Sequence, residues 1–373
     1  MTRQTQTPTR RAQRSLPDSR GPVSKRIVNA VRASTGDAPT AIDVPDDLDP
    51  WGEDVQLALL VCHELHYRGW SDAGRDCEWD PAVISARTRL EDMFLDAVAD
   101  EAAQLLGEGS ADDQLGALAR AVPSGVTAHL KRHGTEDEFN DYFAARSMYH
   151  LKEADPHAWA IPRLSRTAKA AFVAVEYDEY GAGRGERVHQ ELFAELLSSM
   201  NLDDGYLAYL DAAPAVVLAP VNLMSCLGLR RSRRGATVGH FAATEVTSPV
   251  GSAWLLAGLD RIDAPEPARC FYREHVEADA VHEIVMRDEV VASLLADEPS
   301  LHDDVLFGIR ALQVVENRLD AAFTTAWETG EPLMGQDSTG RDLVPIRPRR
   351  SGEISLMNSS VSAFSAPRYG VGT

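Results

Sequence analysis

Apolar residues recur about every 3.6 positions along most of this 373-residue sequence, which restricts the chain to a mainly helical fold. Residues 81–106 are typical, since Leu90, Phe94 and Val98 lie on one face of a helix. The alternating pattern of a half-buried strand is scarce, and the only β-branched cluster, within 216–221, is short. We expect helices at residues 53–69, 81–106, 138–152, 165–180, 186–200, 204–212, 233–247, 250–260, 264–296 and 300–329.

Prolines fall between the predicted helices and mark where they end. Inside a helix, a proline lacks one backbone hydrogen bond and clashes with the preceding turn. The sequence therefore predicts one all-α domain of about eight to ten helices over residues 46–335. The prolines between helices are Pro123, Pro156, Pro162, Pro214, Pro220, Pro265, Pro267 and Pro299.

Both ends of the sequence lack hydrophobic periodicity and are predicted to be disordered tails. Residues 1–45 are rich in Thr, Gln, Arg, Ser and Pro, and their first 34 positions hold eight basic side chains against one acidic. Residues 336–373 contain recurring Gly, Ser and Pro and a short basic patch. The first tail is interpreted as solvated chain, with a basic arm for nucleic acid or an anionic membrane as the alternative.

The composition excludes several classes of protein. Hydrophobic residues make up 44% of the chain, enough for a buried core. The formal charge is −20 and the pI is near 4.9, which argues against general nucleic-acid binding because that needs a basic face. There is no apolar run of about 18 residues and no signal-peptide pattern, so we expect no membrane contact and a cytoplasmic location. The four cysteines have no C-x-x-C spacing, and they are Cys62, Cys77, Cys226 and Cys270.

The clearest chemical signal lies in residues 270–282, where His275, Asp279 and His282 follow the spacing i, i+4, i+7. At 100° per residue these three side chains project from one helix face within about 40° of one another. Two imidazoles and a carboxylate on one rigid element are suitable metal ligands. A polar helix face without a metal is the alternative.

A second signal is the Glu-x-x-His pair of Glu186 and His189, the i, i+3 arrangement that helical di-iron proteins use. Glu179 lies seven residues before Glu186 and shares its face if the helix is continuous. The intervening segment, residues 181–185, holds three glycines, each of which weakens a helix by roughly 1 kcal/mol. We expect these glycines to govern how readily metal enters and leaves. Replacing Gly183 with Ala would stiffen a helical backbone there, but would destabilise one with positive φ.

Other polar residues are weaker candidates. Glu64 lies in the predicted helix 53–69 and would supply a further carboxylate to a pair of iron ions. His240 and Glu245 lie in a half-apolar segment and are interpreted as residues that line a pocket or support the ligands. Histidine ligands need acceptors for their other ring nitrogen, and the candidates for this role are Asp178, Glu274 and Glu283.

Taken together, these motifs resemble the haem-oxygenase-like di-iron oxidases. Residues 152–162 (KEADPHAWAIP), 177–181 (YDEYG) and 274–283 (EHVEADAVHE) resemble the actinobacterial proteins described as iron-containing redox enzymes. The resemblance covers roughly residues 50–330 and leaves out both tails.

The resemblance implies a seven-helix haem-oxygenase-like core that holds two ferrous ions. Glu64 matches the carboxylate of the first helix, and Glu186 matches an additional carboxylate that only some members have. The implied metal ligands are Glu64, Glu179, Glu186, His189, His275, Asp279 and His282.

The leading hypothesis is a non-haem di-iron oxidase or oxygenase that activates O2 to oxidise a small molecule. An external electron donor and a homodimer are compatible with it. The alternative is an iron-binding or metal-free helical protein with a scaffold or storage role. A metal-independent enzyme of the same fold would need a nucleophilic Cys or a Lys in its cavity. The sequence does not distinguish hydroxylation, N-oxygenation, desaturation and C–C cleavage, nor iron from manganese in the second position.

Overall fold

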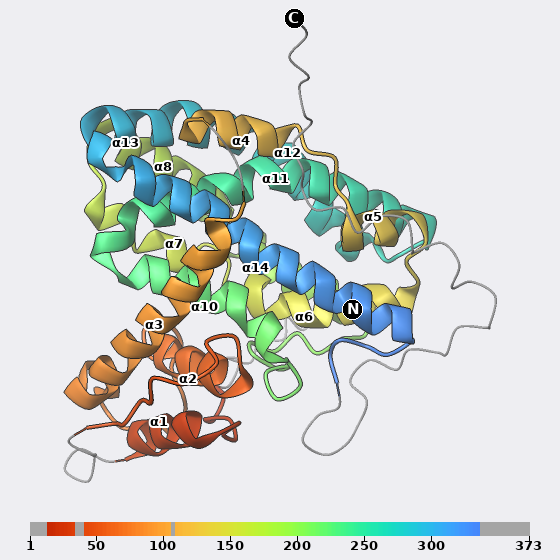
Figure 1. The fold of residues 1–373 in the computed structure, drawn as a ribbon. Coiled ribbons are helices and arrows are strands. Elements are labelled where there is room, and N and C mark those ends of the chain that lie inside the picture. The colour runs from red at the N-terminus through yellow and green to blue at the C-terminus, as the bar shows by residue number, and fades with distance from the viewer. Residues whose placement is uncertain (1–12, 34–40, 106–108, 336–373) are drawn as a thin grey trace, which may run out of the picture.

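The computed structural model describes residues 13–33, 41–105 and 109–335, and over these ranges the fold is all-α, as expected (Figure 1). A π-helical segment, Val285–Val291, continues directly from α12. The α-helices are α1 (Pro22–Arg32), α2 (Glu53–Glu64), α3 (Pro81–Ala102), α4 (Ala111–Ala119), α5 (Gly125–Arg132), α6 (Glu136–His150), α7 (Asp155–Ala158), α8 (Arg166–Glu179), α9 (His189–Ser199), α10 (Ala215–Leu229), α11 (Arg234–Arg261), α12 (Glu266–Ile284), α13 (Ala292–Asp297) and α14 (His302–Thr329).

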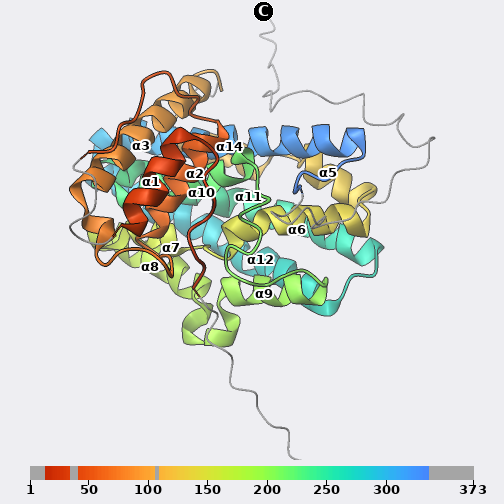
Figure 2. The ribbon, with the colours of Figure 1, turned by 90° about the horizontal axis from the view of Figure 1, so that it is seen from below.

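The long helix α11 is the centre of the arrangement and packs against both α12 and α14. Helix α12 also packs against α9, and the two helices lie side by side in Figure 2. The core has two apolar clusters. One joins α1, α2, α3, α6, α9, α10 and α14, and the other joins α4, α8, α11, α14 and the π-helical segment. The second cluster fixes α8 beside the end of α12, where the chemistry-bearing residues lie.

Local sequence signals explain where several helices begin. At α3 the side chain of Asp80 accepts hydrogen bonds from the backbone N–H groups of Ala82 and Val83, and Pro81 occupies the first turn. At α6 the side chains of Thr135 and Glu138 cap each other's backbone N–H groups. These caps satisfy N–H groups that have no partner within the helix.

Some helix boundaries differ from the prediction. Pro249 lies inside α11, so the predicted helices 233–247 and 250–260 form one helix. Helix α10 runs through Pro220 and was not predicted, because it is buried on almost every side and so shows no amphipathic stripe. The predicted helix 204–212 consists of turns. The short helices α4 and α5 were also missed.

The prediction that residues 1–45 form a disordered tail was wrong for the part that the structure describes. Helix α1 packs against α2 and buries Val23, Ile27 and Val31. The carboxylate of Asp54 accepts hydrogen bonds from the backbone N–H groups at the start of α1, at 2.6 and 2.9 Å. The apolar stripe of α1 was not recognised in the sequence because it is short and many basic residues surround it. The rest of the predicted N-terminal tail, residues 1–12 and 34–40, and the predicted tail 336–373 lie outside the described residues.

Removal of α1 is expected to destabilise the protein. A chain of residues 46–335 should melt more than about 5 °C below a chain of residues 13–335, because each buried Val or Ile of α1 contributes roughly 1.5–3 kcal/mol. Thermal unfolding followed by circular dichroism measures the difference. Equal melting temperatures for the two chains would show that α1 adds nothing to stability.

The described helices also bear on membrane insertion. Within the described ranges, none combines the length and the apolar character that a membrane crossing requires.

Candidate metal centre

Helix α12 presents His275, Asp279 and His282 on its buried face, at the positions that the face arithmetic predicts. All three side chains are at least nine-tenths buried. They face residues from α8, α9 and α11 and from the turn that follows α6, so separate parts of the chain contribute to one interior site.

His275 is oriented by its own helix. Its Nδ1–H donates to the backbone carbonyl of Phe271 at 2.8 Å, so Nε2 is the nitrogen that would carry the lone pair of the neutral ring. This Nε2 has no hydrogen-bond partner among the described residues and lies 3.8 Å from a carboxylate oxygen of Glu153. The ring of His189 is beside it, with 4.5 Å between the ring centroids. Glu153, His189 and His275 thus form one group of metal-ligand type.

His282 faces a second group. Its Nδ1 lies 3.1 Å from Glu245, 3.3 Å from Asp279 and 3.7 Å from Glu179. On the other side of the ring, Nε2–H donates to Asp178 at 3.2 Å. Among the three candidate acceptors, Asp178 is thus the one that contacts a ring nitrogen of His282. Glu274 instead pairs with Arg187, and Glu283 lies near Arg287.

Glu179 connects the two groups. One of its carboxylate oxygens lies 2.8 Å from Nδ1 of His189, and the other faces Nδ1 of His282. The contact with His189 does not have hydrogen-bond geometry, since Nδ1 of that residue has no hydrogen-bond partner among the described residues. A carboxylate with one oxygen toward each group is arranged as a bridging ligand would be.

The buried carboxylates of the site favour a positive charge beside them. Burial opposes charging of His275, but the nearby carboxylates of Glu153 and Asp279 outweigh it and raise the pKa to about 10. Burial also opposes charging of His282, but Asp279 and Glu245 raise its pKa to about 11. Burial, followed by the charge of Asp279, raises the pKa of Glu245 well above its ordinary value. Without a metal, protons supply the positive charge that the buried carboxylates need.

The two groups fit a pair of divalent transition-metal ions. Each offers imidazole nitrogen and carboxylate oxygen, a donor set that suits iron. Several buried donor atoms have no hydrogen-bond partner among the described residues, and a metal would satisfy them. These atoms are Nδ1 of His189, Nε2 of His275 and Oδ1 of Asp279.

Glu64 is not part of either group, so the geometry gives no support to its predicted role as a ligand. Its carboxylate forms a fully buried ion pair with Lys152 and accepts a hydrogen bond from the hydroxyl of Tyr206 at 2.9 Å. It lies at the end of α2, which packs among α1, α3 and α10 (Figure 1). The Glu64 carboxylate therefore already has an ion-pair partner and a hydrogen-bond donor within the protein.

Glu186 is exposed and lies outside both groups. The condition for a face shared by Glu179 and Glu186, a continuous helix, is not met, because α8 ends at Glu179 and two 3-10 turns precede α9. Gly181 and Gly183 have φ of +71° and +80° in this connection. It therefore brings His189 back toward Glu179 by a tight turn rather than by a softened helix.

The sequence analysis missed Glu153 as a site residue and assigned Glu245 only to the lining of a pocket or the support of the ligands. Glu153 lies in an irregular turn after α6, where the arithmetic of helix faces does not apply. Its stretch, residues 152–162, was among those that carry the family resemblance, and this was the available signal. Glu245 lies on the buried face of α11, directly opposite His282.

Alanine substitutions at the two turn glycines should separate two causes of lost stability, the strain of a positive φ and the steric clash of an added Cβ. Gly183→Ala is expected to cost roughly 1–2 kcal/mol from the positive φ alone, since a Cβ there would meet only Tyr177 at 3.5 Å. Gly181→Ala should cost more, because its Cβ would lie 2.6 Å from the backbone of Arg187 and Val188. Urea unfolding of the metal-free protein measures both. Equal losses for the two variants would contradict the close packing at Gly181.

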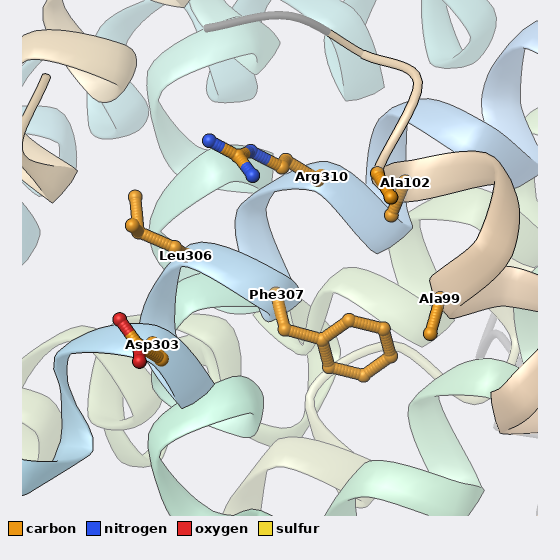
Figure 3. Close-up of a pocket in the computed structure, with 7 residues that line it drawn as sticks. Ala99, Ala102, Asp303, Leu306, Phe307 and Arg310 are labelled. Atoms are coloured by element: carbon orange, nitrogen blue, oxygen red, sulfur yellow. The ribbon is translucent and has the colours of Figure 1, made fainter. Parts of the chain in front are cut away.

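Two pockets of the described surface lie away from this centre. One of about 220 Å³ lies between α3 and α14, where Ala99, Ala102 and Phe307 surround it (Figure 3). Another, of about 410 Å³, lies between α4 and the π-helical segment. Neither is lined by a residue of the two metal-ligand groups.

An all-α fold with buried histidines and carboxylates from several helices is the arrangement that helical metalloproteins use to hold their ions. Residues 140–316, from α6 into α14, match the model of a family described as iron-containing redox enzyme. This match confirms the expected haem-oxygenase-like resemblance over that part of the chain and supports an iron-dependent redox role. The chain matches no curated protein.

Proposed function

We propose that the protein is a non-haem oxidoreductase that holds two ferrous ions and uses O2 to oxidise a small molecule. The ligands would be Glu153, His189 and His275 for one ion and Glu245, Asp279 and His282 for the other, with Glu179 shared between them. This deepens the iron-dependent redox role that the family match supports. An external electron donor would return the oxidised ions to the ferrous state.

The observation that carries the proposal is the position of Glu179 between the two groups. Its two oxygens face His189 and His282, so one carboxylate would hold the two ions next to each other. Adjacent ferrous ions would supply electrons to O2 and open positions at which it binds. A single ion in either group would leave one side of Glu179 without a cation.

The chain's own residues orient and shield this centre. The carbonyl of Phe271 fixes the ring of His275, and the carboxylate of Asp178 fixes that of His282. The burial of the ligands keeps most water away, which strengthens each electrostatic interaction with a bound ion. The four carboxylates Glu153, Glu179, Glu245 and Asp279 balance the charge of two divalent ions.

Anaerobic loading with ferrous iron tests the proposal. We expect two ions per chain by metal analysis, and consumption of O2 when the loaded protein is exposed to air. A chain that binds no iron would overturn the proposal in favour of a scaffold role. A chain that binds iron but consumes no O2 would favour an iron-binding role without oxidase chemistry.

A further inference from the structure

Glu176 lies on α8, one turn before Glu179, and is only 2% exposed. Residues three apart on a helix project from the same side, so the two carboxylates are neighbours on the face that carries the bridge. Neither carboxylate oxygen of Glu176 has a hydrogen-bond partner among the described residues. Glu176 is nevertheless outside both metal-ligand groups.

The other buried carboxylates that the structure describes outside the two metal-ligand groups are satisfied by the chain itself. Glu64 has Lys152, Glu91 has Arg230, and Asp141 accepts hydrogen bonds from Trp327 and two backbone N–H groups. An unpaired buried carboxyl group is costly, because it loses its hydration without gaining a partner. Glu176 is therefore the exception that needs an explanation.

The surroundings of Glu176 are acidic. Burial, and then the charges of Glu179, Glu245 and Asp155, raise the pKa of its carboxyl group well above the ordinary range. No ion pair with an Arg or Lys side chain is recorded for it among the described residues. A cation bound at Glu179 and Glu245 would reduce the repulsion that these carboxylates exert on Glu176.

We propose that Glu176 is a further carboxylate ligand of the metal centre, beside the bridging Glu179. This inference rests on the proposed two-ion site. It assigns to Glu176 the additional carboxylate that sequence reasoning had assigned to Glu186, which is exposed and lies outside both groups. No hydrogen bond among the described residues holds the Glu176 carboxylate in its present rotamer.

Glu176→Gln tests the inference, since it removes the charge and keeps the volume. With Mn2+ as an air-stable divalent probe, the affinity measured by calorimetry is expected to fall roughly tenfold or more. The metal-free variant should melt at or above the wild-type temperature, because the amide is not repelled by the neighbouring carboxylates. The rise in melting temperature on metal binding should be smaller than in wild type. Glu186→Gln is the matched control and should behave like wild type.

Glu176→Asp separates a ligand role from a packing role. A ligand role predicts that Asp, which keeps the carboxylate, binds Mn2+ more tightly than Gln does. A packing role predicts the reverse, because Gln has the shape of Glu and Asp leaves a gap. Wild-type protein that binds two ions, together with a Gln variant of unchanged affinity, would overturn the role of Glu176 alone. Wild-type protein that binds no metal ion at all would instead overturn the proposed function.

Discussion

Replacing His275 with Ala is expected to reduce the iron content from two ions per chain to one. The group of Glu153, His189 and His275 would keep only one nitrogen donor, whereas Glu245, Asp279 and His282 would still hold an ion with Glu179. Metal analysis after anaerobic ferrous loading and gel filtration measures this. O2 consumption should fall to the background level, because the pair of ions is lost.

A matched control for this variant is His302→Ala, which removes an exposed histidine at the start of α14. It should retain two ions and full O2 consumption. The His275 variant should still unfold cooperatively, since the two apolar clusters do not depend on metal. If it loads two ions and reacts with O2 as fast as wild type, the assignment of the first group is wrong.

The second large effect is expected at the buried ion pair between Lys152 and Glu64, in which neither side chain is exposed. Lys152→Met removes the cation and leaves Glu64 as a buried charge with only Tyr206 and a backbone N–H of Arg68 as donors. The expected loss of stability is about 3–5 kcal/mol. Urea unfolding of the metal-free protein is the measurement.

The double variant Lys152→Met, Glu64→Gln should recover most of that loss, because no uncompensated charge remains. It should also still bind two ions, since Glu64 lies outside both metal-ligand groups. A double variant that stays as unstable as the single one would mean that the loss comes from packing. Loss of an ion in the double variant would restore Glu64 as a ligand.

The part of the site that could be predicted from the sequence lies on one continuous helix. His275, Asp279 and His282 have a fixed spacing on α12, and the rotation per residue places them together whatever the rest of the fold does. The same reasoning failed for Glu179 and Glu186, because the backbone between them turns at Gly181 and Gly183 instead of continuing as a helix.

The carboxylates supplied by other parts of the chain were harder to predict. Glu153 and Glu64 differ in their three-dimensional surroundings, since one faces His275 and the other faces Lys152. No local pattern distinguishes them. In the fold as a whole, the long amphipathic helices were predicted, whereas the short helices α4 and α5 were missed. Helix α10 was missed because it is apolar on all sides, and α1 because charged residues flank its apolar stripe.

Because His282 is hydrogen-bonded to Asp178, the two ion positions of the centre are expected to exchange metal at different rates. The Asp178 side chain is 50% exposed and contacts His282 directly, so only this side chain separates the group at His282 from solvent. On the other side, Glu153 is 12% exposed and the ring of His275 is held by a carbonyl of its own helix. An ion at the His282 group should therefore exchange with the surroundings first, while its neighbour stays bound. The two halves of the centre would then fill and empty in a fixed order.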